Sequence, residues 1–344
     1  MGEKYKVAIL TGVGQAEITE KELRQPQGHQ VRVKVDSCAI CTLEQRMYNG
    51  VMKRYPFAGG HEASGTVVAV GEFVKSLRKG DKVAARLLTS CGECYFCRSG
   101  HENQCVISFM ANVHEGVGGP GGFAEYMMLD AKKLYKVADD LDLTHAALAE
   151  PLACCVHSIN NANIGLGEDV VVIGVGIMGA FHIKLAKLRG ARVIACEVEE
   201  ERLEVAKKMG ADLLINSKKV NAVDKVKELT EERGADVVFC TAALTKLAEE
   251  SIQIVSKAGR VIMYSSFHPD NPIDLSVNKV HSSEMNITGA VNANTRDFLA
   301  ATRLLSSHMV DPSILISETV PLEKLDYAFK RAIDPKTYRI VIKA

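Results

Sequence analysis

The chain has 344 residues, with 42 acidic and 42 basic side chains and a formal net charge of zero. At about 150 residues per domain, this length predicts two domains. The charge balance gives no general attraction to nucleic acid or anionic membranes, so we expect neither as a partner. No apolar run approaches the ~20 residues that span a bilayer, and MGEKYKVAIL lacks a signal-peptide pattern, so we expect a cytoplasmic protein.

The first half of the sequence predicts strands and loops. Residues 29–35, HQVRVKV, alternate valines with polar side chains, as in a half-buried strand. Short runs at 64–71 and 80–85, bounded by glycines, predict two further strands. The glycine-rich run at 116–122 predicts a loop.

The ten cysteines need a chemical explanation, because a reducing compartment disfavours structural disulfides. Where cysteines cluster in such a protein, they indicate metal binding or catalysis. Four lie in apolar sequence and are predicted to be small buried hydrophobes: Cys154, Cys155, Cys196 and Cys240. The other six cluster: Cys38, Cys41, Cys91, Cys94, Cys97 and Cys105.

The stretch CGECYFCRSGHENQC predicts a structural zinc site. Its spacing is C-x2-C-x2-C-x7-C, formed by Cys91, Cys94, Cys97 and Cys105. Four thiolates complete a tetrahedral zinc shell and leave no open position. An iron–sulfur cluster is the alternative, although the ferredoxin run places its fourth cysteine differently. Four unrelated free thiols are the remaining alternative.

From about residue 165 strands and helices alternate. EDVVVIG, residues 168–174, is a continuous apolar strand of the kind a parallel sheet needs. After it come a helix-compatible run to residue 190 and further predicted elements. The strands are at 191–197, 212–216, 235–240 and 259–265, with helices at about 200–209 and 225–234. This alternation predicts a doubly wound α/β sheet.

The segment VVVIGVGIMG predicts a dinucleotide site. Gly174, Gly176 and Gly179 have GxGxxG spacing, directly after a strand and at the start of a helix. Such glycines permit a tight turn and let the backbone approach a pyrophosphate at the helix N-terminus, where Ile177 and Met178 lie. The alternative is that these glycines only cap a buried strand.

Glu197 ends the next predicted strand, 18 residues after Gly179. An acid at about this distance binds the adenosine ribose hydroxyls and repels a 2′-phosphate, so NAD is predicted over NADP. Arg202 follows closely, and because an arginine can accept that phosphate, NADP stays open as the alternative.

Four further residues could hold a second metal. Cys41, His61 and Glu62 (in GGHEASG) and Glu150 (in AEPLACC) offer the sulfur, nitrogen and oxygen ligands typical of a catalytic zinc with an open position. Taken singly, each has an ordinary explanation, as a surface pair or a buried thiol. Sequence spacing does not establish that the four converge.

Together these motifs resemble the zinc-containing medium-chain dehydrogenase/reductase superfamily, and within it the polyol (sorbitol) and threonine dehydrogenase branch. The resemblance covers nearly the whole chain and rests on the Cys41 region, GGHEASGTVVAVG, the four-cysteine lobe, GGFAEY, AEPLACC and GVGIMG. It implies a GroES-like, mostly-β catalytic domain at 1–156 and 295–344, with a structural zinc lobe at about 88–110. It also implies a Rossmann NAD-binding domain at 157–294.

The resemblance also implies a function. Cys41, His61 and Glu62 fall at zinc-ligand positions, and Glu150 lies where the polyol branch has a glutamate near the metal, bound directly or through water. The family reaction is reversible oxidation of a secondary alcohol, here of a polyol, sugar derivative or amino alcohol. The zinc lowers the pKa of the alcohol, and hydride passes to NAD. The family habit predicts a homotetramer or homodimer.

Residues 41–46, CTLEQR, depart from the family pattern. Thr42 and Gln45 predict a capping box and a helix that begins just after Cys41, whose thiolate the helix N-terminus favours. Relatives often have Cys-Gly-Thr-Asp-Leu-His here, in which the hydroxyl residue and the histidine relay the alcohol proton to solvent.

In this chain Leu43 replaces the hydroxyl residue, Glu44 the aspartate and Arg46 the histidine. Leucine has no exchangeable proton and arginine stays protonated, so the usual relay is absent. Three explanations are open. The proton leaves through Glu62, Glu150 or zinc-bound water; the substrate is acidic or supplies its own hydroxyl; or the protein is an isomerase or lyase with retained NAD.

Arg46 has a possible role of its own. Its planar fork suits the cofactor pyrophosphate or an anionic substrate group, with an exposed helical arginine as the alternative. A non-catalytic zinc- and nucleotide-binding protein is a third class of function, which the joint presence of all four candidate ligands disfavours. Residues expected to line the substrate pocket are Leu43, Tyr48, Phe57, Met110 and Asn112.

Overall fold

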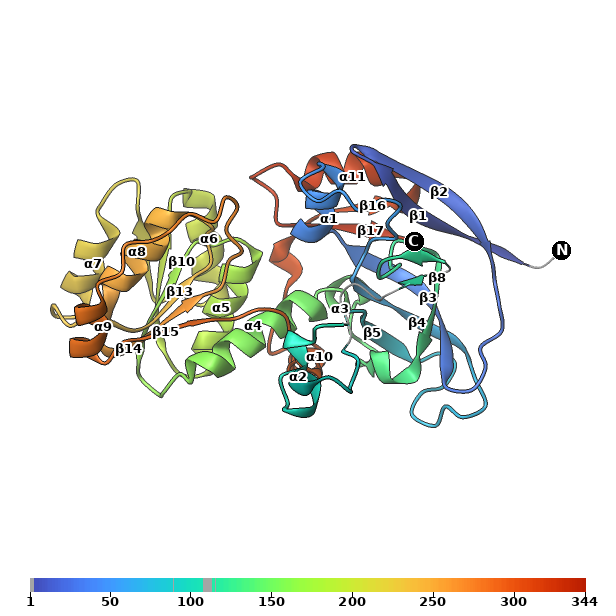
Figure 1. The fold of residues 1–344 in the computed structure, drawn as a ribbon, viewed down its shortest axis with the longest axis horizontal. Coiled ribbons are helices and arrows are strands. Elements are labelled where there is room, and N and C mark those ends of the chain that lie inside the picture. The colour runs from blue at the N-terminus through green and yellow to red at the C-terminus, as the bar shows by residue number, and fades with distance from the viewer. Residues whose placement is uncertain (1–2, 89, 108–112, 115) are drawn as a thin grey trace. The chain divides into compact units, whose positions relative to one another are not determined.

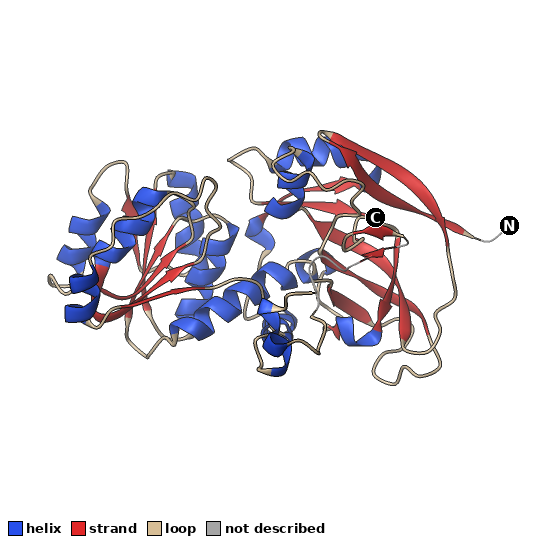
Figure 2. Ribbon diagram, in the orientation of Figure 1, coloured by secondary structure: helices blue, strands red, loops and turns tan. Residues whose placement is uncertain are grey.

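The computed structural model describes residues 3–88, 90–107, 113–114 and 116–344. Of the predicted pocket residues, Met110 and Asn112 lie outside this part of the chain. Two compact units are formed, one by residues 1–153 with 294–344 (unit 1) and one by residues 154–293 (unit 2). Strands dominate unit 1, whereas strands and helices alternate in unit 2 (Figures 1 and 2).

Unit 2 is built on a six-stranded parallel sheet in the order β12-β11-β10-β13-β14-β15. This is the doubly wound strand order, and the predicted α/β sheet is confirmed. Every residue of β10 is buried, as its continuous apolar sequence requires. The strands are β10 (Asp169–Ile173), β11 (Arg192–Glu197), β12 (Leu213–Asn216), β13 (Ala235–Cys240), β14 (Val255–Met263) and β15 (Asn286–Gly289).

Helices connect consecutive strands of this sheet, with α5 packed on α6 and α7 packed on α8. They are α5 (Ile177–Leu188), α6 (Glu200–Met209), α7 (Ala222–Leu229), α8 (Thr245–Ile254) and α9 (Val277–Ser283). The helix predicted to continue to residue 234 instead ends at Leu229. Thr230 turns its hydroxyl back onto Val226 O, and the two following glutamates have left-handed backbones, which ends the helix.

Unit 1 contains a seven-stranded sheet whose central strand is β3 (Gln30–Ala39). Val31, Val33 and Val35 are buried on one face of β3, as their alternation predicts. The other strands are β4 (Glu62–Val70), β5 (Lys82–Arg86), β8 (Tyr126–Asp130), β9 (Leu134–Lys136), β16 (Ile316–Pro321) and β17 (Arg339–Lys343). Two further antiparallel pairs are β1 (Lys4–Gly12) with β2 (Gln15–Glu22) and β6 (Val113–His114) with β7 (Val117–Gly118).

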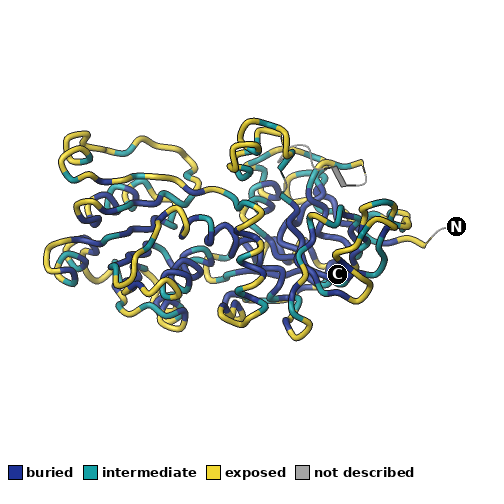
Figure 3. The backbone as a smooth tube through the Cα atoms, turned by 90° about the horizontal axis from the view of Figure 1, so that it is seen from below, coloured by how far each residue is buried: buried dark blue, intermediate teal, exposed yellow. Residues whose placement is uncertain are grey.

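Unit 1 has mostly short helices, and its two longer ones are α4 (Ala149–Ala162), which begins in unit 1 and ends in unit 2, and α10 (Thr295–Ser306). The others are α1 (Thr42–Tyr48), α2 (Tyr95–Arg98), α3 (Leu143–Ala146) and α11 (Leu325–Ala332). Four 3-10 turns complete the described elements: η1 (Glu102–Gln104), η2 (Ala131–Lys133), η3 (Ser313–Leu315) and η4 (Leu322–Lys324). The backbone of each unit is buried along its sheet and exposed at its loops (Figure 3).

Helix α1 begins directly after Cys41, as predicted, but the predicted capping box is wrong. Cys41 itself takes the extended N-cap position and Thr42 is the first helical residue, so no side chain caps this end. The first-turn N–H groups of this seven-residue helix therefore have no side-chain cap. No helix in the described part of the chain is long and apolar enough to cross a membrane.

Candidate active site

The four cysteines of the predicted zinc lobe are brought together in unit 1. Their sulfur atoms all lie within 4.8 Å of one another. The distances Cys91–Cys97, Cys94–Cys97 and Cys94–Cys105 are 3.8, 3.5 and 3.9 Å. Four sulfurs at ~2.3 Å from one zinc ion stand about 3.8 Å apart at tetrahedral corners, so this geometry fits the ion.

Backbone groups of the lobe favour thiolate sulfur. The N–H of Cys91 donates to Cys105 Sγ at 3.4 Å, and the N–H of Cys94 donates to Cys91 Sγ at 3.4 Å. Burial acts to raise the pKa of Cys105, but the N–H donors of Cys91 and Ile107 outweigh it and lower the pKa to about 5. The pKa of Cys97 in the same cluster is instead raised to about 12, because burial and the neighbouring sulfurs favour its protonated form.

A second cluster of potential ligands lies at one end of the unit 1 sheet. Cys41 follows β3, Glu62 begins β4, and Glu150 lies in the first turn of α4. His61 belongs to two groups of close ligand atoms, one with Glu62 and Glu150 and one with Cys41 and Glu44. Its Nε2 lies 3.9 Å from Glu150 Oε2, which leaves room for one ion bound to both at about 2.1 Å.

His61 is held by a residue whose role the sequence did not reveal. Glu44 is fully buried on α1, and its Oε1 accepts hydrogen bonds from His61 Nδ1 at 2.7 Å and Gly60 N at 3.0 Å. Because Nδ1 is the donor in this contact, Nε2 is the nitrogen available to a metal. Burial lowers the pKa of His61, but the charges of Glu44 and Cys41 together raise it well above its usual value.

Arg339 is the second residue that the sequence analysis missed. At the start of β17, it donates to both carboxylate oxygens of Glu62, at 2.6 and 3.0 Å, and its Nη2 lies 3.7 Å from Cys41 Sγ. Burial is the largest influence on the pKa of Glu62 and raises it, while Arg339 opposes that rise. The buried guanidinium thus balances the charge of Glu62 and also contacts the Cys41 sulfur.

The residues that depart from the family pattern lie on α1. Leu43 is half-buried and packs against the hydrophobic core of unit 1, and Arg46 is half-buried in the last turn. Tyr48, which was predicted to line the substrate pocket, is 4% exposed, and its ring is stacked on Phe329 with the ring centroids 4.5 Å apart. Phe57 is half-buried and packs against the same core as Leu43.

The glycine-rich loop of unit 2 joins β10 to α5 at the point where the strand order reverses. Gly174 has a φ of +88°, and a Cβ on Gly179 would lie 1.9 Å from Gly174 O, so both positions require glycine. Thr241 donates to Gly174 O at 2.8 Å and fixes the turn. Gly176 caps α5 without a side chain, which leaves first-turn N–H groups for a phosphate.

Glu197 and Arg202 flank this loop. Glu197 Oε2 accepts a hydrogen bond from Val175 N at 2.8 Å, and Oε1 accepts one from Val198 N at 2.7 Å. Arg202 donates to Val175 O at 3.3 Å, and its Nη1 lies 3.5 Å from the position of a Cβ on Gly176. Glu197 and Arg202 thus both contact Val175 of this turn, and Ile177 and Met178 begin α5 after it.

Comparison with known proteins decides the family. Residues 27–139 match the alcohol dehydrogenase GroES-like domain, and residues 174–307 match the zinc-binding dehydrogenase family. The chain belongs to the zinc-containing medium-chain dehydrogenases. As a member of the polyol dehydrogenase branch it is a zinc-type alcohol dehydrogenase that uses a nicotinamide cofactor, and the predicted GroES-like and Rossmann folds are confirmed.

Several relatives are similar along nearly their whole length. The dehydrogenase is 32% identical to 2-dehydro-3-deoxy-L-galactonate 5-dehydrogenase of Pseudoalteromonas atlantica, over 91% of this chain and 90% of that protein. It is 31% identical to a sorbitol dehydrogenase of Halalkalibacterium halodurans, over 95% of each. A crystal structure of an Escherichia coli alcohol dehydrogenase complexed with NADH has a TM-score of 0.90, with 27% identity and 100% of both chains covered.

Proposed function

We propose that this dehydrogenase interconverts a secondary alcohol of a polyol, sugar derivative or amino alcohol with its ketone, using NAD. The observation that supports the proposal is that His61, buried in unit 1, has a ligand atom close to that of Cys41 in one group and to those of Glu62 and Glu150 in another. Thiolate, imidazole and carboxylate together are the ligand mixture of catalytic zinc sites. A zinc ion bound there supplies a Lewis acid for the substrate oxygen.

The chain's own residues have separate tasks in this proposal. Glu44 orients His61, and Arg339 neutralises Glu62 beside Cys41, so that these side chains are fixed before substrate arrives. Leu43 packs into the core and offers no exchangeable proton. We therefore assign the proton transfer to Glu150, which a carboxylate near the substrate oxygen performs directly or through one water.

Arg46 bears on the class of substrate. It is half-buried on α1, the helix that Cys41 caps, and its planar fork suits a carboxylate or a phosphate group. The named substrate of one relative, a dehydro-deoxy-galactonate, is a sugar acid, whereas sorbitol is uncharged. We propose that Arg46 binds either an anionic substrate group or the cofactor pyrophosphate.

The proposal also covers the choice of cofactor, the oligomeric state and the partners. Glu197 supports NAD over NADP, because its carboxylate, which contacts the glycine loop at Val175, suits ribose hydroxyls and repels a 2′-phosphate. We also propose a cytoplasmic homotetramer or homodimer, on the habit of the family. The zero net charge supports the absence of a nucleic-acid partner.

One observation favours a second candidate function. Because Leu43 replaces the hydroxyl residue of the usual relay, the net reaction could be an isomerisation or elimination in which NAD is reduced transiently and reoxidised before release. The two candidates differ in whether NADH accumulates.

The experiment is a substrate screen with metal-free and zinc-replete protein. Polyols, sugar acids, phosphosugars and amino alcohols are each incubated with NAD, and NADH is followed by absorbance. We expect NADH with at least one of these substrates, and only after zinc is restored. Turnover that is unchanged by removal of zinc would overturn the proposal.

A further inference from the structure

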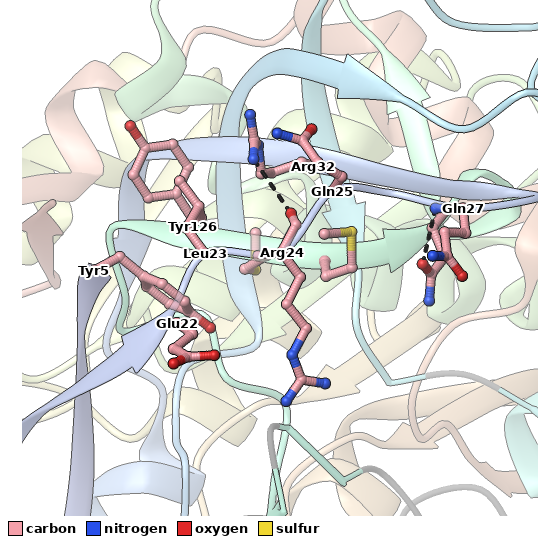
Figure 4. A pocket seen from close by; sticks show the side chains of 11 residues that line it. Tyr5, Glu22, Leu23, Arg24, Gln25, Gln27, Arg32 and Tyr126 are labelled. Carbon is pink, nitrogen blue, oxygen red and sulfur yellow. Dashed lines mark hydrogen bonds between the residues drawn. The ribbon is translucent and has the colours of Figure 1, made fainter. Parts of the chain in front are cut away.

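A cavity of about 580 Å³ lies in unit 1, over the face of the sheet that carries Arg32. Its walls come from β1, the end of β2, the segment that follows β2, β3 and β8 (Figure 4). The volume falls within the range of about 300–1,000 Å³ that is typical of small-molecule sites. None of its lining residues has a part in the zinc site or the glycine loop.

Strand register explains which side chains form the floor of this cavity. Val31 and Val33 point into the core, so Arg32 between them lies on the opposite face of β3. Its partner on β8 is Met128. Tyr126 lies on the same face of β8 and packs edge-on against Tyr5, with ring centroids 6.0 Å apart.

The segment between β2 and β3 forms the opposite wall. Arg32 Nη1 donates to Arg24 O at 3.2 Å, and the N–H of Gln27 donates to Gln30 Oε1 at 3.1 Å (Figure 4). These two contacts tether the segment to β3. Gln25 also lines the space, so amide groups border it on several sides.

The charge of Arg32 has no counter-ion in the described part of the chain. The Arg24 carbonyl oxygen that it contacts is a neutral acceptor, and its Nε is buried without any acceptor among the described residues. Glu22 lines the same cavity but makes no ion pair with it. A half-buried guanidinium that lacks an anion is unfavourable, so an anion beside it would be bound with a gain in free energy.

We propose that this cavity binds a small hydroxylated organic anion, with its carboxylate or phosphate group beside Arg32. Tyr126 and Met128 provide apolar surface for a carbon chain, and the glutamine amides suit hydroxyl groups. Arg32 and Ala39 are separated by seven residues of extended strand, about 23 Å at roughly 3.3 Å per residue. The site is therefore distinct from the Cys41 cluster beyond the end of β3.

Isothermal titration calorimetry on the full chain tests this proposal. The probes are gluconate, ribose 5-phosphate and inorganic phosphate, with sorbitol as the uncharged comparison. We expect Arg32→Met to weaken binding of the anions about tenfold or more, because one charge-assisted contact is lost. Lys34→Met is the matched control, since Lys34 lies on the same strand, two residues on, and does not line the cavity.

Two further variants keep the test decisive. Met128→Glu places a carboxylate opposite Arg32 and should block the anions even if Arg32→Met does not fold. Arg46→Ala should leave anion binding in the Arg32 cavity unchanged. This result would distinguish that binding from binding of an anionic substrate near Arg46. Preference for carboxylate or for phosphate probes identifies the anionic group. The proposal would be overturned if no anion bound, or if the wild type and both cavity variants bound the anions with equal affinity. It would also be overturned if sorbitol bound as tightly as gluconate, or if only Arg46→Ala lost binding.

Discussion

His61 Nδ1 lies 2.7 Å from Glu44 Oε1, and this buried contact leaves the opposite ring nitrogen facing Glu150. Partners of this kind fix the tautomer and the orientation of a metal-binding imidazole. We expect Glu44→Ala to weaken zinc affinity at the His61 site by roughly 10–100-fold, measured by competition with a chromogenic chelator.

Gln45→Ala provides the control for this variant, because Gln45 lies on the same helix and its side chain makes no cap contact. Its zinc affinity should match that of the wild type. Unchanged zinc affinity in Glu44→Ala would show that the contact does not position His61.

The four-cysteine lobe should contribute to folding, whereas the His61 site should contribute to turnover. Cys94→Ser removes one of four sulfurs that lie within 4.8 Å of one another, so we expect one metal ion fewer per chain and a lower Tm. His61→Ala should instead have the Tm of the wild type and no turnover. Metal analysis and thermal unfolding of both variants check this division, and an unchanged Tm in Cys94→Ser would contradict it.

Glu150 should carry the proton that Leu43 cannot. We expect Glu150→Gln to lower kcat by roughly 10²–10⁴-fold, the effect typical of losing a general acid–base group. Leu43→Thr should change kcat far less, and Arg46→Ala should mainly raise KM, because a positioning arginine contributes binding. Zinc content is measured in each variant. A zinc-replete Glu150→Gln enzyme with a kcat near that of the wild type would rule out this route.

Glu197 should set the choice of cofactor. Glu197→Gln keeps hydrogen-bonding capacity but removes the charge that repels a 2′-phosphate, so the ratio of kcat/KM for NAD to that for NADP should fall about tenfold or more. Glu199→Gln, an exposed neighbour, is the control and should leave the ratio unchanged. Comparable kcat/KM for NAD and NADP in the wild-type enzyme would be the contrary result.

His182 should make the free energy of unfolding depend on pH. It is fully buried in unit 2, where Nδ1 donates to Met178 O at 2.7 Å and Nε2 accepts from Ser158 Oγ at 2.8 Å. Burial lowers its pKa to about 4. Because an unfolded histidine titrates near pH 6.5, the unfolded state binds more protons between about pH 6.5 and 4, and stability falls as the pH is lowered through that window.

Urea unfolding at pH 7 and pH 5 measures this effect. The loss of unfolding free energy between the two values should be about 2 kcal/mol smaller in His182→Gln than in the wild type. His281→Gln, at an exposed histidine of α9 in the same unit, should behave as the wild type does. The same pH dependence in His182→Gln and the wild type would exclude a neutral buried His182.

Local sequence signals predicted much of the fold. The glycine spacing at 174–179 and the apolar strand before it lie within a dozen residues, and the four-cysteine spacing lies within fifteen, so each could be recognised without tertiary structure. The four cysteines predicted to be buried are buried, at Cys154, Cys155, Cys196 and Cys240.

Contacts between distant segments could not be predicted in this way. Arg339 pairs with Glu62 across 277 positions, because β17 and β4 lie on either side of β3. The burial of Tyr48 depends on Asp326 and Phe329 from the far end of the chain. Glu44 lies closer to its partner, yet only the fold turns a residue of α1 toward His61.

Net formation of NADH tests the central claim most directly. Zinc-replete enzyme is incubated with NAD and the best substrate from the screen, and NADH and ketone are quantified together. The account predicts equal amounts of the two, formed over many turnovers and absent in His61→Ala. Conversion of the substrate without accumulation of NADH would contradict it and would identify an isomerase or lyase with retained cofactor.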